Sequence, residues 1–138
     1  MREDPDKKPK EDGDVTRHTF ADGEDIERAK RVPGTIFMEE VDLSHPLAYG
    51  LGQTTLPVFR SGKLLLELTD SPYQTPLVYA EEPLAAGYLP EGEADRVARQ
   101  AAAVVAPLGK GRVIAMTDDL VFRGYWFGSM RLLGNTVF

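Results

Sequence analysis

Two histidines and a polar cluster near the C-terminus are the candidates for chemistry in this chain of 138 residues. His18 and His45 are the only histidines, and they are far apart in the sequence. A catalytic zinc typically takes three rigidly held protein ligands, so two separated histidines do not predict a zinc centre. His45 precedes Pro46, where it is expected to start a short helix or pack against one.

Asp118 and Asp119, followed by Arg123, form a polar cluster between a predicted strand and a predicted helix. That junction is where α/β sheets commonly place binding sites. The structural alternative is that one of the aspartates caps the helix and Arg123 pairs with a carboxylate. Trp126 lies among more aromatic residues than one helical stripe needs, so some rings are expected to face outward or into a neighbouring domain.

The absence of cysteine excludes a disulfide framework, a thiolate nucleophile and Cys-ligated metals. The glycines at 109 and 111 do not make a phosphate-binding loop, because the required second Gly-Lys-Ser/Thr run is missing. A net charge of -6 argues against nucleic acid as a partner. No apolar run approaches the length of a membrane span, so no membrane partner is expected.

Composition divides the chain into two parts. Residues 1–31 are more than half charged and read as a flexible arm or linker. Residues 32–138 read as a single α/β domain: a mixed central sheet with a C-terminal helix packed on it.

Within that domain, residues 35–41 predict a strand, and Ser44 is expected to cap a short helix that Gly50 ends. A hairpin is predicted from 54–59 and 63–68, then a short strand at 77–80 and a helical turn at 82–88. Residues 91–99 permit a helix. The apolar runs 101–106 and 113–116 predict an antiparallel hairpin at the sheet centre. Apolar spacings of three and four predict a helix from Phe122 to the C-terminus, and its glycines predict close packing on the sheet.

Two stretches resemble a known family: RVPGTIF at 31–37 followed by DLSHPLAYG at 42–50, and GKGRVIAMTDDLVFRGYWFGSMRLLGN at 109–135. Together they resemble the C-terminal region of bacterial zinc-carboxypeptidase-like proteins, of the carboxypeptidase A-like metallopeptidase family. That region follows the catalytic domain and is similar to a degenerate class I glutamine-amidotransferase domain. The resemblance implies a partial amidotransferase-like, flavodoxin-like architecture.

The family's zinc motif, His-x-x-Glu with a later His, does not occur in this chain. The resemblance therefore implies a non-catalytic accessory domain without a cofactor of its own, with zinc in a separate catalytic domain. That domain, a zinc metallocarboxypeptidase, is the implied partner, and the implied location is secreted or periplasmic. The alternative is an independent glycan- or small-metabolite-binding module that uses Asp118, Arg123 and Trp126.

Overall fold

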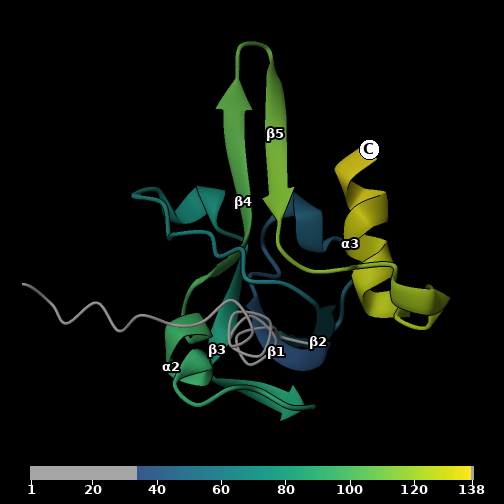
Figure 1. The fold of residues 1–138 in the computed structure, drawn as a ribbon. Helices are drawn as coiled ribbons and strands as arrows, with labels where there is room; N and C mark the ends of the chain where they lie inside the picture. Colours follow the sequence, from purple (N-terminus) through teal and green to yellow (C-terminus); the bar gives the residue numbers. More distant parts are fainter. Residues whose placement is uncertain (1–33, 138) are drawn as a thin grey trace, which may run out of the picture.

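Five antiparallel strands form one curled sheet in the order β2-β1-β3-β4-β5 (Figure 1). The computed structural model describes residues 34–137. The strands are β1 Thr35–Val41, β2 Thr55–Arg60, β3 Leu77–Ala86, β4 Ala101–Leu108 and β5 Gly111–Met116. The helices are η1 Pro46–Ala48, η2 Pro72–Gln74, α2 Glu93–Val97, η3 Phe122–Gly124 and α3 Phe127–Val137.

The core lies on the inner face of the curl. Buried and more exposed residues alternate along β1, because successive side chains of a strand point to opposite faces. The rings of Phe37 and Tyr79 meet edge to face, with centroids 5.7 Å apart. Val58 on β2, Leu77 on β3 and Leu132 on α3 complete the same buried cluster.

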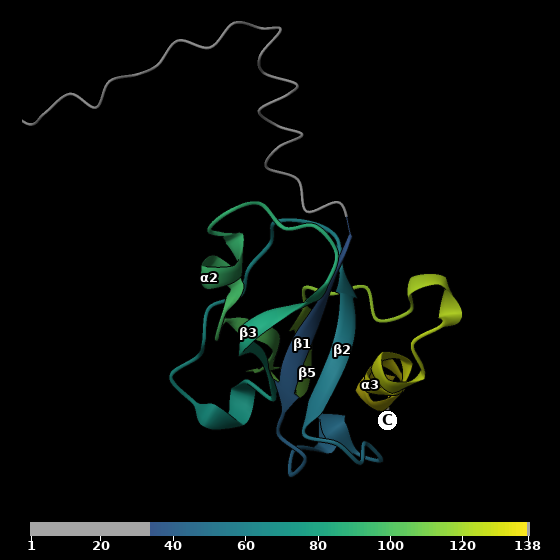
Figure 2. The same ribbon diagram turned by 90° about the horizontal axis from the view of Figure 1, so that it is seen from below.

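The segment after β5 crosses to β2 at the other end of the sheet. The backbone N–H of Asp119 donates to the carbonyl of Phe59 on β2 at 3.0 Å, and the rings of Phe59 and Phe122 stack 3.6 Å apart. The hydroxyl of Ser129 on α3 donates to the Leu120 carbonyl at 2.7 Å. Helix α3 consequently lies beside β2, as Figure 2 shows.

The hairpin of β4 and β5 extends beyond the rest of the sheet (Figure 1). Leu108 pairs with Gly111 across a turn made by Gly109 and Lys110. Gly109 has a positive φ of 59°, a conformation that glycine adopts at little cost. The antiparallel hairpin predicted at 101–106 and 113–116 is confirmed, as are the first strand at 35–41 and a short helix within 91–99.

The expected mixed sheet is wrong, because every strand pairing in the sheet is antiparallel. Parallel neighbours need a long crossover connection, usually a helix, and no helix in residues 34–137 joins two parallel strands. The expected α/β domain with a C-terminal helix beside the sheet is confirmed. A flavodoxin-like sheet is parallel, so that architecture is not confirmed.

The predicted hairpin of 54–59 with 63–68 is also wrong. Strand β2 pairs with β1, and the segment 63–68 forms no strand but a single isolated β-bridge between Leu66 and Ala101. The predicted helical turn at 82–88 is instead the second half of β3, which continues to Ala86. Both errors arise because the long-range partner β1 overrides local preferences.

The terminal helix begins at Phe127 instead of Phe122. Arg123 and Gly124 have positive φ values of 51° and 68°, which a right-handed helix cannot contain. The hairpin is not at the sheet centre, because β5 is an edge strand with partly exposed side chains. The predicted arm, residues 1–31, lies outside the described residues.

Candidate functional site

The inner face of the sheet holds a buried polar cluster made of Glu39, Arg60, Tyr79, Thr117 and Asp118. Glu39 on β1 pairs with Tyr79 on β3, Arg60 ends β2, and the other two residues follow β5 directly. Glu39, Arg60 and Tyr79 are each at most 2% exposed. The curl of the sheet therefore brings together residues from four strands or strand ends.

Tyr79 is the centre of this cluster. Its hydroxyl accepts a hydrogen bond from Arg60 Nη1 at 2.5 Å and donates to Asp118 Oδ2 at 2.7 Å. The Thr117 hydroxyl lies 2.8 Å from the hydroxyl oxygen of Tyr79. Arg60 Nη2 donates to the carbonyl of Leu64. The guanidinium of Arg60 and the carboxylate of Asp118 are thus linked through one phenol.

Burial strongly raises the pKa of Glu39 above its ordinary value of 4.5, and the neighbouring Asp118 carboxylate raises it further. Glu39 Oε2 is buried without a hydrogen-bond partner in the described residues, and the charge of Arg60 lowers the pKa against these effects. Burial and the Asp118 charge likewise raise the pKa of Tyr79. With Glu39 protonated, Arg60 and Asp118 balance each other and the cluster is neutral, as a low-dielectric interior requires.

Asp118 is only partly buried and also lines a pocket of about 460 Å³. Asp119 lies in the same pocket, and its Oδ1 accepts a hydrogen bond from the Val121 backbone N–H at 3.2 Å. The expectation that one of these aspartates caps the helix is wrong, because the N-cap of η3 is Val121, which has no side-chain cap, and α3 begins only at Phe127. The pocket wall includes Met116, Leu120 and Leu133, so the two carboxylates face an apolar surface.

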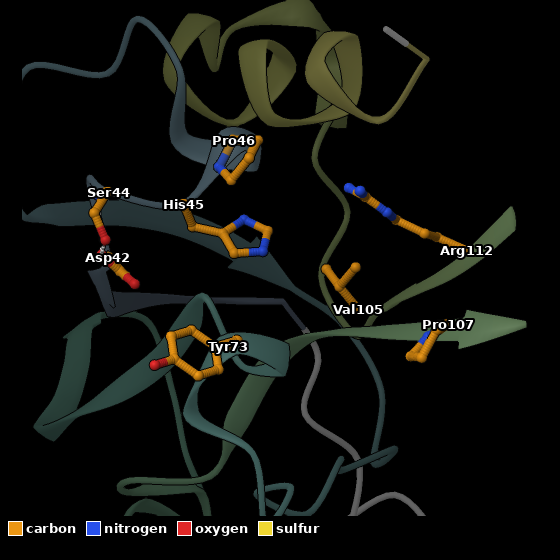
Figure 3. A pocket seen from close by; sticks show the side chains of 8 residues that line it. All are labelled: Asp42, Ser44, His45, Pro46, Tyr73, Val105, Pro107 and Arg112. Atoms are coloured by element: carbon orange, nitrogen blue, oxygen red, sulfur yellow. Dashed lines mark hydrogen bonds between the residues drawn. The ribbon is translucent and has the colours of Figure 1, made fainter.

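His45 lines a second pocket of about 350 Å³ (Figure 3). It is the N-cap of η1, and its Nδ1 accepts a hydrogen bond from the backbone N–H of Leu47 at 3.1 Å. His45 therefore does start the short helix, as expected. The predicted cap, Ser44, instead donates its hydroxyl and backbone N–H to Asp42 Oδ1, at 2.6 and 2.9 Å.

The two pockets belong to one groove along the β4–β5 hairpin, which we call the hairpin groove. A third pocket of about 410 Å³ lies between them. It shares His45 and Val105 with the pocket at His45, and Ile114 and Thr136 with the pocket at Asp118. Arg112 lines all three. The wall opposite the hairpin comes from η1 and the end of α3. Asn135 on α3 fixes that wall, because its Nδ2 donates to the carbonyls of Leu47 at 2.7 Å and Tyr49 at 2.9 Å.

Sequence reasoning placed His45 and Asp118 among the site residues but missed Arg112. Arg112 directly follows the turn at Gly109 and Lys110. That turn was predicted to be a plain hairpin connection, and the structure confirms it. The available signal was strand alternation: Arg112, Ile114 and Met116 are spaced by two and therefore share one face of β5.

Arg123 and Trp126 line neither the three pockets of the hairpin groove nor a fourth pocket beside Phe127 and Gly128. The Arg123 guanidinium lies 5.2 Å from the centroid of the Phe122 ring. No ion pair joins it to Asp118 or Asp119 in this part of the chain, so the expected pairing is not found. Trp126 is half-buried, between the strongly exposed rings of Tyr125 and Phe127.

Residues 34–137 contain no group of three or more His, Asp or Glu side chains placed to hold a metal ion. In the same range, every helix is too short or too polar to cross a bilayer. Compared with models of protein families, with curated proteins and with solved structures, the chain matches none of them.

Proposed function

We propose that this chain is a non-catalytic accessory domain of a zinc-carboxypeptidase-like hydrolase. It packs on the peptidase domain and orients or regulates it, in a secreted or periplasmic protein. The proposal joins the family resemblance of residues 33–50 and 109–135 to one structural observation, an exposed aromatic surface. The peptidase domain supplies the zinc and the chemistry, and this chain supplies a binding surface.

The observation that carries the proposal is the aromatic corner, which consists of Tyr125, Trp126 and Phe127. Tyr125 is 74% exposed and Phe127 is 81% exposed. Phe127 also forms one wall of a hollow of about 490 Å³ beside Leu56 and Gly128. Exposed aromatic side chains beside a hollow of mixed polar and apolar lining are typical of protein interfaces, where buried rings provide much of the binding energy.

The polar residues support a binding role over catalysis. The carboxylate of Asp118 already accepts from the Tyr79 hydroxyl, and Glu39 is buried without access to solvent. A glutamine amidotransferase needs an activated cysteine, which this chain lacks. The proposed amidotransferase-like ancestry rests on the resemblance alone, because the sheet is antiparallel throughout.

The experiment begins with the coding sequence upstream of Met1 in the native gene, where we expect a His-x-x-Glu motif and a later His. The peptidase domain encoded there is then tested for binding to this chain by calorimetry. A double variant, Tyr125→Ser with Phe127→Ser, should weaken binding at least tenfold, because each buried ring contributes on the order of 1 to 2 kcal/mol. Tyr88→Ser, at a 67% exposed site outside the corner, serves as control.

The proposal fails if the native gene encodes no peptidase domain, or if the domain binds wild type and double variant equally. The alternative, a glycan- or metabolite-binding module using Asp118, Arg123 and Trp126, has less support. Asp118 lines a pocket, but Arg123 and Trp126 do not share it. A ligand-dependent rise in melting temperature that Trp126→Ala abolishes would favour that alternative.

A further inference from the structure

Two hydrogen-bond donors converge in the hairpin groove, from His45 and Arg112. Because His45 Nδ1 accepts from the Leu47 N–H, the proton of the neutral ring is on Nε2. Figure 3 shows the ring turned toward Val105 and the Arg112 guanidinium extending back toward the ring. Among residues 34–137, Arg112 forms no ion pair. A guanidinium and an imidazole N–H therefore face the same space and lack an acceptor.

Apolar side chains line part of the surface around these donors, beside the polar Asn135 and Thr136 of α3. Val105 and Pro107 on β4 and Ile114 on β5 form the floor, and Pro46 and Val137 stand on the opposite wall. Small-molecule sites usually combine such a lining with a few convergent polar groups that fix the orientation of the ligand. The groove is therefore suited to a molecule with one acceptor group and an apolar body.

The charges around the groove select a monoanion. Arg112 is the only Lys or Arg that lines these pockets, whereas Asp42, Asp118 and Asp119 line their ends. Hydrogen bonds from Ser44 lower the pKa of Asp42, so its carboxylate is charged at neutral pH. Figure 3 places Asp42 and Ser44 on the side of His45 away from Arg112. A phosphate dianion would meet too little positive charge, but a carboxylate matches the planar guanidinium in charge and geometry.

We propose that the hairpin groove binds a small organic carboxylate, with the carboxylate between His45 and Arg112 and its apolar body along Val105 and Ile114. This site is separate from the aromatic corner and does not depend on the docking function proposed above.

The test is a titration of the folded chain with hexanoate, followed by backbone NMR shifts and by calorimetry. We expect shifts concentrated at 45–47, 105 and 112–114. Hexanamide, which has the same body without the charge, should bind at least tenfold more weakly, the effect expected on losing a charge-assisted hydrogen bond. Inorganic phosphate should not compete.

Two variants isolate the donors. Arg112→Gln should weaken hexanoate binding at least tenfold. His45→Asn keeps an acceptor for the Leu47 N–H but removes the Nε2 donor, and should weaken binding severalfold. Lys110→Gln removes one positive charge from the turn of the same hairpin without touching the groove, so it should bind like wild type. Circular dichroism confirms that each variant is folded.

A short peptide with a free C-terminus, compared with its amide, tests whether a polypeptide carboxylate is the better source of the group. The proposal is overturned if hexanoate and hexanamide bind alike, or if folded Arg112→Gln retains wild-type affinity. It is equally overturned if the shifts lie outside the groove or if millimolar hexanoate causes none.

Discussion

Tyr79 links the charged groups of the core. Among residues 34–137, its hydroxyl is the only side-chain group that forms a hydrogen bond with Arg60, and it also donates to Asp118. The buried guanidinium of Arg60 and the partly buried carboxylate of Asp118 both lose hydration, so the bridge must replace the lost hydrogen bonds. One oxygen atom therefore connects β2, β3 and the segment that follows β5.

Replacing Tyr79 with Phe is expected to lower the free energy of unfolding by about 1 to 3 kcal/mol, the usual cost of leaving buried polar groups without a partner. The aromatic contact with Phe37 is preserved in this variant, so the loss reports on the hydroxyl. Urea denaturation measures it. Tyr88→Phe, at an exposed ring, should change stability little, and equal losses in the two variants would contradict the role given to Tyr79.

Glu39 makes the stability of the protein depend on pH. Since its folded pKa is raised above 4.5, the folded state retains a proton that the unfolded chain has released. The contribution of Glu39 to stability is therefore fully present below pH 4.5 and is lost as the pH rises toward the folded pKa, by up to about 1.4 kcal/mol per pH unit. Glu39→Gln should be more stable than wild type at neutral pH, with the advantage absent near pH 4.

Denaturation of both proteins between pH 4 and 8 measures this difference. Glu40→Gln, at the exposed neighbouring position, should show no such divergence from wild type. A constant difference between Glu39→Gln and wild type across this range would show that burial does not shift the Glu39 carboxyl.

At the scale of elements, helix α3 packs closely against β2 at Gly128 but not at Gly134. A Cβ built on Gly128 would lie 2.7 Å from Leu56 Cδ1 on β2, whereas one on Gly134 meets nothing within 4 Å. Gly134→Ala should stabilise the protein by about 0.5 to 1 kcal/mol, the helix preference of alanine over glycine. Gly128→Ala should gain less, because Leu56 must move. Thermal and urea unfolding of the pair measure the difference, and an equal gain would contradict the close packing.

Local patterns predicted the elements whose signals lie within a few residues of one another. The β4–β5 hairpin and the strand at β1 follow from apolar content and glycine turns. The pairing of β2 with β1, the length of β3 and the edge position of β5 depend on contacts between distant segments, which one sequence does not display. The apolar stripe predicted for the last helix fails for the same reason, since Met130, Leu133 and Val137 are exposed while Ser129 and Leu132 are buried.

The candidate site was predictable in part. His45 was identified by its residue type and its place before Pro46, and Asp118 by its position after a strand. The buried cluster was not predicted, because Glu39, Arg60 and Tyr79 come from three separate strands and look like surface residues of alternating strands. Arg112 becomes part of a pocket only because α3 and η1 fold opposite it, which the sequence around Arg112 does not indicate.

At the scale of the whole molecule, the purified chain is expected to bind no stoichiometric zinc and to release no C-terminal residue from peptides. The reason is compositional: two separated histidines and no cysteine provide too few strong zinc ligands. Metal analysis after dialysis and an assay with blocked dipeptides measure these properties. One zinc ion per chain, or turnover that a single substitution abolishes, would contradict the expectation.

The contact between the segment after β5 and the Phe59 carbonyl has a consequence for biosynthesis. The edge strand β2 is covered by η3 and α3, so it waits for residues made about seventy positions later in the chain. At translation rates of roughly 5 to 20 residues per second, this delay is on the order of 4 to 14 seconds. During that interval β3 can already pair with β1, but the side of β2 that α3 later covers stays open to solvent.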